Sequence, residues 1–171
     1  DPGRLAASED GKTDAYYFLV FNANKKSVTA NLKTEEGLDL VKKMAAKADV
    51  MIENFAPGTV ERLGLGYDVI KEINPGIIYA QVKGFAVDSP YEKFLSFDMI
   101  AQASGGIMSI TGEEGRPPVR VGPSIIDMAT GMWAVIGILA ALHRRELTGE
   151  GCELDTSLYE TPLTWIGTQA A

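Results

Sequence analysis

The chain has 171 residues, of which 46% are hydrophobic and 23% charged, the balance of a globular protein with a real core. Its net charge of −7 argues against a nucleic-acid-binding surface. The single cysteine, Cys152, excludes an internal disulfide framework and favours a reducing, cytoplasmic setting. The single histidine, His143, leaves little basis for a metal site or a Ser-His-Asp triad.

Short apolar runs alternate with helical patterns along the chain. Strands are predicted at residues 16–21 (a buried, aromatic run), 27–32, 50–52, 77–82 and 152–157. Helices are predicted at residues 35–48, 59–63, 67–73, 98–104 and about 128–145, with a last one beginning near residue 158. This β-α-β alternation predicts an α/β fold, a parallel sheet flanked by helices, with no domain linker inside the chain.

The longest apolar stretch is residues 131–142. It is too short to cross a bilayer, and we expect a buried helix and no membrane partner.

Asp127 directly precedes the long predicted helix. A carboxylate there caps the helix by accepting hydrogen bonds from its first backbone N–H groups. The same position keeps the carboxylate ionised through the helix dipole. An ionised, partly desolvated carboxylate can attack an activated carbonyl such as a thioester. The local pattern therefore supports a cap and a nucleophile, and the two roles are compatible.

The segment 53–58 (ENFAPG) joins a predicted strand to a helix, and loops at the carboxyl ends of parallel strands bind ligands in open α/β sheets. Asn54 and Phe55 would hydrogen-bond to a planar ring and stack on it. The alternative is a plain turn with Phe55 packed inward. Lys33 and Arg62 are candidate phosphate partners, although each alone is more typical of a solvated surface charge.

Several segments between residues 20 and 160, taken in order, resemble the motifs of one family. They include residues 22–27 (NANKKS), 33–37 (KTEEG), 48–58 (ADVMIENFAPG), 62–64 (RLG), 83–85 (KGF), 102–105 (QASG), and Asp127 followed by 148–151 (TGEG). The chain is identified by this resemblance as a member of the class III CoA-transferases, a family that also contains acyl-CoA racemases.

The resemblance implies a Rossmann-like fold. Residues 1–171 would form part of the family's large, CoA-binding domain, with an N-terminal segment and a second domain absent. The full-length protein would be an interlocked homodimer.

The resemblance also implies a reaction. The aspartate that matches Asp127 attacks the donor acyl-CoA to give a mixed anhydride and free CoA thiolate, and further exchange with a small carboxylic acid yields the new thioester. Lys33, Asn54, Phe55 and Arg62 match CoA-contact positions. Coenzyme A and acyl-CoA are substrates, and neither a tightly bound cofactor nor a metal is expected.

One departure separates two branches of the family. The racemases carry a His-Asp pair where this chain has Phe97-Asp98, so one of the two bases of the racemase is missing and a transferase is favoured. The alternatives are a racemase or epimerase that uses Asp127 as a base, and an inactive, CoA-binding fragment.

Overall fold

The computed structural model describes residues 14–169, which fall into two compact units that divide between Ala30 and Asn31. The described part of the first unit contains α1 (Tyr16–Asn22), and no residue of this helix is buried. The prediction of a buried strand at 16–21 is therefore wrong. A helix satisfies its own backbone groups, whereas a strand needs a neighbour. Tyr17 and Phe21, one turn apart on α1, bring their ring centroids to 4.7 Å.

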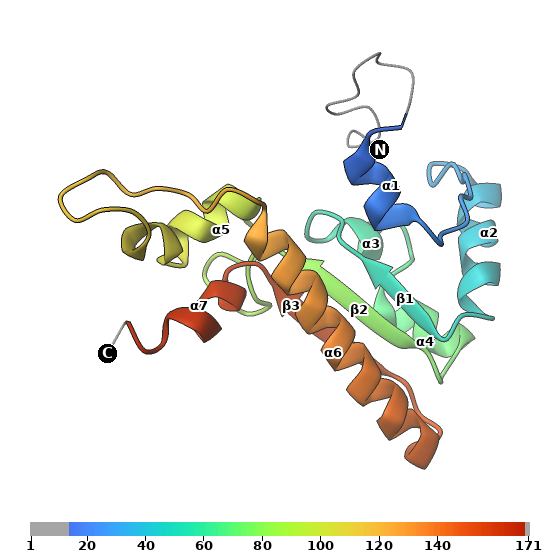
Figure 1. Cartoon of the computed structure of the whole chain (residues 1–171). Helices are drawn as coiled ribbons and strands as arrows, with labels where there is room; N and C mark the ends of the chain where they lie inside the picture. The colour runs from blue at the N-terminus through green and yellow to red at the C-terminus, as the bar shows by residue number, and fades with distance from the viewer. Residues whose placement is uncertain (1–13, 170–171) are drawn as a thin grey trace. The chain divides into compact units, whose positions relative to one another are not determined.

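The second unit is built on a three-stranded sheet of β1 (Val50–Glu53), β2 (Ile78–Lys83) and β3 (Cys152–Ser157) in the order β1-β2-β3. Both strand pairs are parallel, with Ile52 opposite Ala80 and Ala80 opposite Leu154. The α/β fold with a parallel sheet is thus confirmed (Figure 1). The strand predicted at 27–32 does not form. All three described strands end at the same edge of the sheet, which we call the carboxyl edge.

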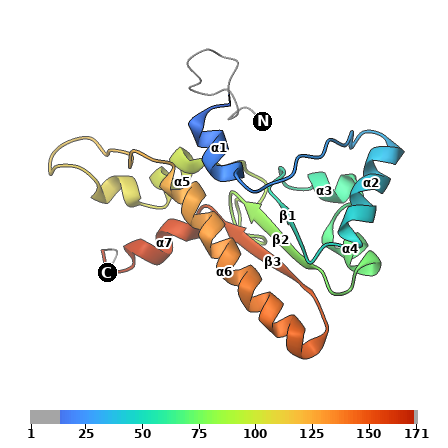
Figure 2. The ribbon, with the colours of Figure 1, turned by 45° about the vertical axis from the view of Figure 1, so that its right-hand side comes forward.

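Helices cover both faces of this sheet (Figure 2). The helices α2 (Glu35–Ala45), α3 (Thr59–Arg62) and α4 (Tyr67–Ile73) contribute to one hydrophobic cluster, and α6 (Ile125–Thr148) contributes to the cluster on the opposite face. Near the carboxyl edge, α5 (Asp98–Ser104), the short 3₁₀ helix Ile107–Ile110 and α7 (Glu160–Ile166) surround a third cluster.

Strand β2 supplies side chains to both clusters because successive residues of a strand point to opposite faces. Tyr79 packs in the cluster of α2, α3 and α4, while Ile78 and Ala80 pack against α6. The Tyr79 hydroxyl donates a hydrogen bond to the Leu65 carbonyl oxygen at 2.9 Å. The strand is therefore buried on both faces, as its continuous apolar run predicts.

Helix α6 is longer than predicted and is buried on one face only. It begins at Ile125, three residues before the predicted start, so that Asp127 lies in its first turn and not at its cap. It ends where Gly149 adopts a left-handed conformation at φ 76°. The predicted buried helix is correct for one face only, since Met132 and Leu139 are 67% and 61% exposed.

By length and composition alone, α6 would also qualify as a membrane span, a test that helices of globular cores pass too.

Candidate active site

A cavity of about 470 Å³ opens at the carboxyl edge of the sheet. The loop after β1, the end of β2, the segment before α5, the first turn of α6 and the residue after β3 all contribute to its wall. The lining residues are Asn54, Phe55, Ala56, Pro57, Val82, Lys83, Gly84, Phe94, Leu95, Ser96, Phe97, Asp127 and Leu158. This is the place where open parallel sheets bind ligands, because the loops that leave neighbouring strands converge there.

A buried ion pair fixes the conformation of the loop after β1. The side chains of Glu53 and Lys83 lie on the same face of the sheet and are 2% and 10% exposed. One carboxylate oxygen of Glu53 meets Lys83 Nζ, and the other accepts a hydrogen bond from the Phe55 N–H at 2.8 Å. Lys83 Nζ also donates to the Phe55 carbonyl oxygen at 3.1 Å. Both backbone groups of Phe55 are thereby held, which presents its ring and Asn54 to the cavity.

Asp127 enters the cavity from the first turn of α6. Its backbone N–H and that of Ile126 point toward the carboxylate of Asp98, the first residue of α5, at 3.4 and 2.8 Å. Ser124, at the cap position, makes no side-chain cap hydrogen bond. A residue distant in the sequence therefore caps this helix.

The electrostatic surroundings of Asp127 favour its protonated form. Partial burial raises the pKa of its carboxyl above the ordinary 3.8, and the nearby negative charge of Asp98 raises it further. The amino-terminal end of α6 acts in the opposite sense, because its dipole favours an anion. A carboxylate that is less well solvated than in water is more reactive toward an electrophile once it is ionised.

The structure brings three of the five predicted site residues to one cavity: Asn54, Phe55 and Asp127. Phe55 is 45% exposed, so the alternative of a plain turn with this ring packed inward is wrong. Arg62 and Lys33 are exposed and do not line the cavity. The Arg62 guanidinium donates to Thr59 Oγ1 at 3.0 Å, and Lys33 lies just before α2.

Glu53, Lys83 and Asp98 are not among the site residues predicted from the sequence. For the first two a signal is present, because opposite charges directly follow two neighbouring predicted strands, and long side chains at the ends of adjacent strands can reach one another. The resemblance marks Asp98 as part of the Phe97-Asp98 pair, but its capping role has no local signal, since its partners lie 28 and 29 residues further along the chain.

The model of CoA-transferase family III matches residues 1–171. The chain belongs to this family. A formyl-CoA:oxalate CoA-transferase of Streptomyces avermitilis is 47% identical to it over 150 residues, which cover 88% of this chain and 36% of that protein. A succinyl-CoA:mesaconate CoA-transferase of Haloarcula marismortui is 42% identical over 158 residues, covering 89% and 40%.

A solved family III structure, a CAIB/BAIF family protein from Brucella suis, superposes with a TM-score of 0.91 at 38% identity. The superposition covers 99% of this chain and 46% of that one. The chain thus spans less than half the length of these relatives.

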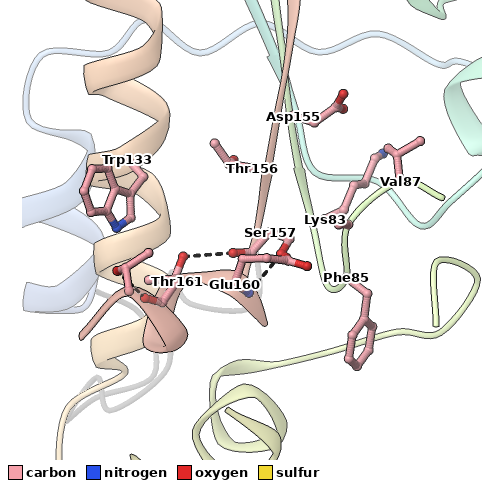
Figure 3. A pocket seen from close by; sticks show the side chains of 11 residues that line it. Lys83, Phe85, Val87, Trp133, Asp155, Thr156, Ser157, Glu160 and Thr161 are labelled. Carbon is pink, nitrogen blue, oxygen red and sulfur yellow. Dashed lines mark hydrogen bonds between the residues drawn. The ribbon is translucent and has the colours of Figure 1, made fainter. Parts of the chain in front are cut away.

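A second, smaller cavity of about 250 Å³ lies between the ends of β2 and β3, α6 and α7 of this family III chain (Figure 3). Trp133 and Phe85 lie on opposite sides of it, and Lys83, which also lines the larger cavity, reaches it. Its acidic side chains are Asp155, whose pKa is raised chiefly by burial, and Glu160. Glu160 Oε2 is buried and has no hydrogen-bond partner among the described residues.

Within residues 14–169, no three histidine, cysteine, aspartate or glutamate side chains are grouped so that they would hold a metal ion. The chemistry that the described residues offer at the larger cavity is that of a carboxylate beside an aromatic ring and an amide.

Proposed function

We propose that this chain carries the nucleophile and part of the CoA site of a CoA-transferase that moves CoA from an acyl-CoA donor to a carboxylic acid acceptor. The observation that carries the proposal is the meeting of Asp127 with Asn54 and Phe55 in one cavity at the carboxyl edge. This cavity combines a carboxylate that can attack a thioester with an aromatic ring and an amide that can contact the adjoining part of CoA.

In the proposed reaction, a carboxylate oxygen of Asp127 attacks the carbonyl carbon of the donor thioester. The C–S bond breaks, CoA leaves as the thiolate, and an anhydride joins Asp127 to the acyl group. Attack of the thiolate on the aspartyl carbonyl then releases the donor acid and leaves CoA on Asp127 as a thioester. The acceptor carboxylate repeats these two steps in reverse, which yields the new acyl-CoA and regenerates Asp127.

The CoA molecule has a thioester end, which reacts, and a phosphate end, which is charged. We assign different residues to the two ends. Phe55 offers a ring face and Asn54 an amide for the part of CoA inside the cavity. Arg62 and Lys33 supply exposed cations for the phosphates outside it. The named relatives act with formyl-CoA and oxalate or with succinyl-CoA and mesaconate, which supports a small carboxylic acid as acceptor. We propose that the complete protein works in the cytoplasm as a homodimer.

Mass spectrometry of the full-length protein after incubation with acyl-CoA tests this proposal. We expect a covalent adduct on the peptide that contains Asp127, lost on treatment with hydroxylamine. The Asp127→Ala variant should show neither adduct nor turnover. Asp68→Asn is the control, because this carboxylate is 97% exposed on α4 and should leave both unchanged. Activity that survives Asp127→Ala would overturn the proposal.

Racemisation is the alternative, with Asp127 as a base. It requires a second base across the substrate, and Phe97, 72% exposed at the cavity, has no group that can accept or donate a proton. Lys83 is the other ionisable side chain that lines this cavity, and it is engaged by Glu53. Exchange of the α-hydrogen of a 2-methylacyl-CoA with solvent deuterium, without CoA transfer, would favour the racemase.

A further inference from the structure

Asp98 holds the first turn of a helix to which it does not belong. Its side chain is 5% exposed, and its Oδ1 accepts the N–H of Ile126 at 2.8 Å and that of Asp127 at 3.4 Å. A helix leaves the N–H groups of its first turn without partners inside the helix. Since Ser124 does not cap α6, Asp98 supplies the acceptor from the start of α5.

Gln102 completes the arrangement on the other side of Asp98. Its Nε2 donates to Asp98 Oδ2 at 2.6 Å, and its Oε1 accepts the N–H of Val121 at 2.8 Å. Gln102 is fully buried. The pair therefore fastens α5 both to the first turn of α6 and to the segment that leads into it.

Asp98 makes no ion pair with a basic side chain in the part of the chain that the structure describes. A buried carboxylate without a cation costs stability unless hydrogen bonds and a helix dipole offset the loss of water. A neutral asparagine could accept the same two N–H groups through its amide oxygen, so capping of α6 alone does not require the charge. The carboxylate accepts hydrogen bonds from α6 through one oxygen and from Gln102 through the other, and it brings a negative charge close to Asp127.

We propose that Asp98 is a positioning residue for Asp127, which fixes the first turn of α6 so that the Asp127 carboxylate stays at the cavity wall, and which holds a negative charge beside it. This inference rests on the proposed function of Asp127. The raised pKa of Asp127, to which the charge of Asp98 contributes, is consistent with it.

The charged groups around Asp127 come from three elements. Asp98 faces it from α5, and Lys83 lines the same cavity from the end of β2 with its charge balanced by Glu53. The third is the amino-terminal end of α6 itself. Removal of the Asp98 charge should therefore lower the pKa of Asp127, whereas the other two contributions stay unchanged.

Two variants of the full-length protein separate charge from hydrogen bonding. Asp98→Asn removes the charge, and its new NH₂ group faces the NH₂ group of Gln102, so that one of the buried hydrogen bonds is lost. The double variant Asp98→Asn/Gln102→Glu restores the bonding pattern. In it the new amide donates to the new carboxylate, which still accepts the N–H of Val121. The negative charge then lies one side chain further from Asp127.

The first readout is turnover. We expect Asp98→Asn to lower kcat at least tenfold with KM for acyl-CoA changed less than threefold, because the nucleophile and not the CoA site is displaced. The double variant should recover kcat to within threefold of the unsubstituted protein. An unchanged kcat in Asp98→Asn would overturn the proposal. So would a double variant that has an unaltered melting temperature but a kcat as low as that of Asp98→Asn.

The second readout does not depend on turnover. Carbodiimide couples an amine to protonated carboxyl groups, so labelling of the Asp127 peptide measured against pH by mass spectrometry reports its protonation. We expect the midpoint to move to lower pH in Asp98→Asn. A midpoint that does not move would contradict the electrostatic part. If Asp127→Ala were active while the midpoint moved, the proposed function would fail and the electrostatic interaction between the two carboxylates would stand.

Discussion

Glu53 and Lys83 end two neighbouring parallel strands, and their ion pair lies beneath the loop that presents Phe55 to the cavity. Neither side chain needs to touch a substrate to affect binding, because together they hold both backbone groups of Phe55. The same ion pair therefore stabilises the carboxyl ends of β1 and β2 and fixes the shape of the cavity wall.

Breaking this pair from one side should be costly. Lys83→Met leaves the Glu53 carboxylate buried without its cation, and we expect the free energy of unfolding to fall by about 3 kcal/mol. Urea unfolding measures the change. In the double variant Glu53→Gln/Lys83→Met no uncompensated charge remains, so its loss should be smaller than that of Lys83→Met alone. A single variant as stable as the unsubstituted protein would show that the pair contributes little.

Gly84 should tolerate no side chain. A Cβ at this position would lie 2.7 Å from Ser96 Cβ and 2.8 Å from its backbone nitrogen. Gly84→Ala should therefore displace the segment before α5, cost about 1–3 kcal/mol of stability and raise KM for acyl-CoA. Gly122→Ala is the matched control, because a Cβ there meets no atom within 4 Å. Equal effects of the two variants would argue against a steric cause.

The Tyr79 hydroxyl should make stability depend on alkaline pH. Burial, followed by the charge of Glu53, raises the pKa of Tyr79 above its ordinary 10.0. The folded state therefore keeps this proton at a pH where the unfolded chain loses it, so stability is present below about pH 10 and declines as pH rises further.

Tyr79→Phe should lower stability by about 1 kcal/mol at neutral pH, through the lost hydrogen bond to Leu65, and should make the decline above about pH 10 shallower. Urea unfolding at a series of pH values measures both effects. Tyr91→Phe, at a position 55% exposed, is the control. An unchanged slope in Tyr79→Phe would exclude this tyrosine as the cause.

The acid limb of the activity profile should reflect Asp127. Because its pKa is raised above 3.8, the protonated, unreactive form should appear at a higher pH than for an aspartate with the ordinary pKa. We expect kcat to fall on acidification while the protein is still folded, as followed by kcat against pH with circular dichroism in parallel. Loss of activity only together with unfolding would contradict this assignment.

Sequence patterns predict the fold well where the pattern is local. The strands at 77–82 and 152–157 and the helices at 67–73 and 98–104 are found within one residue of the predicted bounds. The aromatic run at 16–21 is misleading, because β-forming side chains do not make a strand without a neighbour to pair with.

The candidate site is likewise predictable where its residues belong to local sequence motifs. Asn54, Phe55 and Asp127 follow from motif and position, and the cavity brings them together. The predicted start of α6 is too late because its cap is the distant Asp98 and not the residue directly before the helix. Such tertiary capping leaves no trace within a window of neighbouring residues, so the local pattern assigns the cap to Asp127 instead.

The parallel sheet also places the turn after α6 and the cavity at opposite ends of its strands. The turn at 149–151 lies at the opposite edge from the cavity, and β3 with its six residues spans the distance between them. At about 3.3 Å per residue, that is roughly 20 Å. A fluorescent dye or surface tether attached at the exposed Glu150 would therefore leave the carboxyl edge open to ligands, and would allow CoA binding to be followed on an immobilised protein.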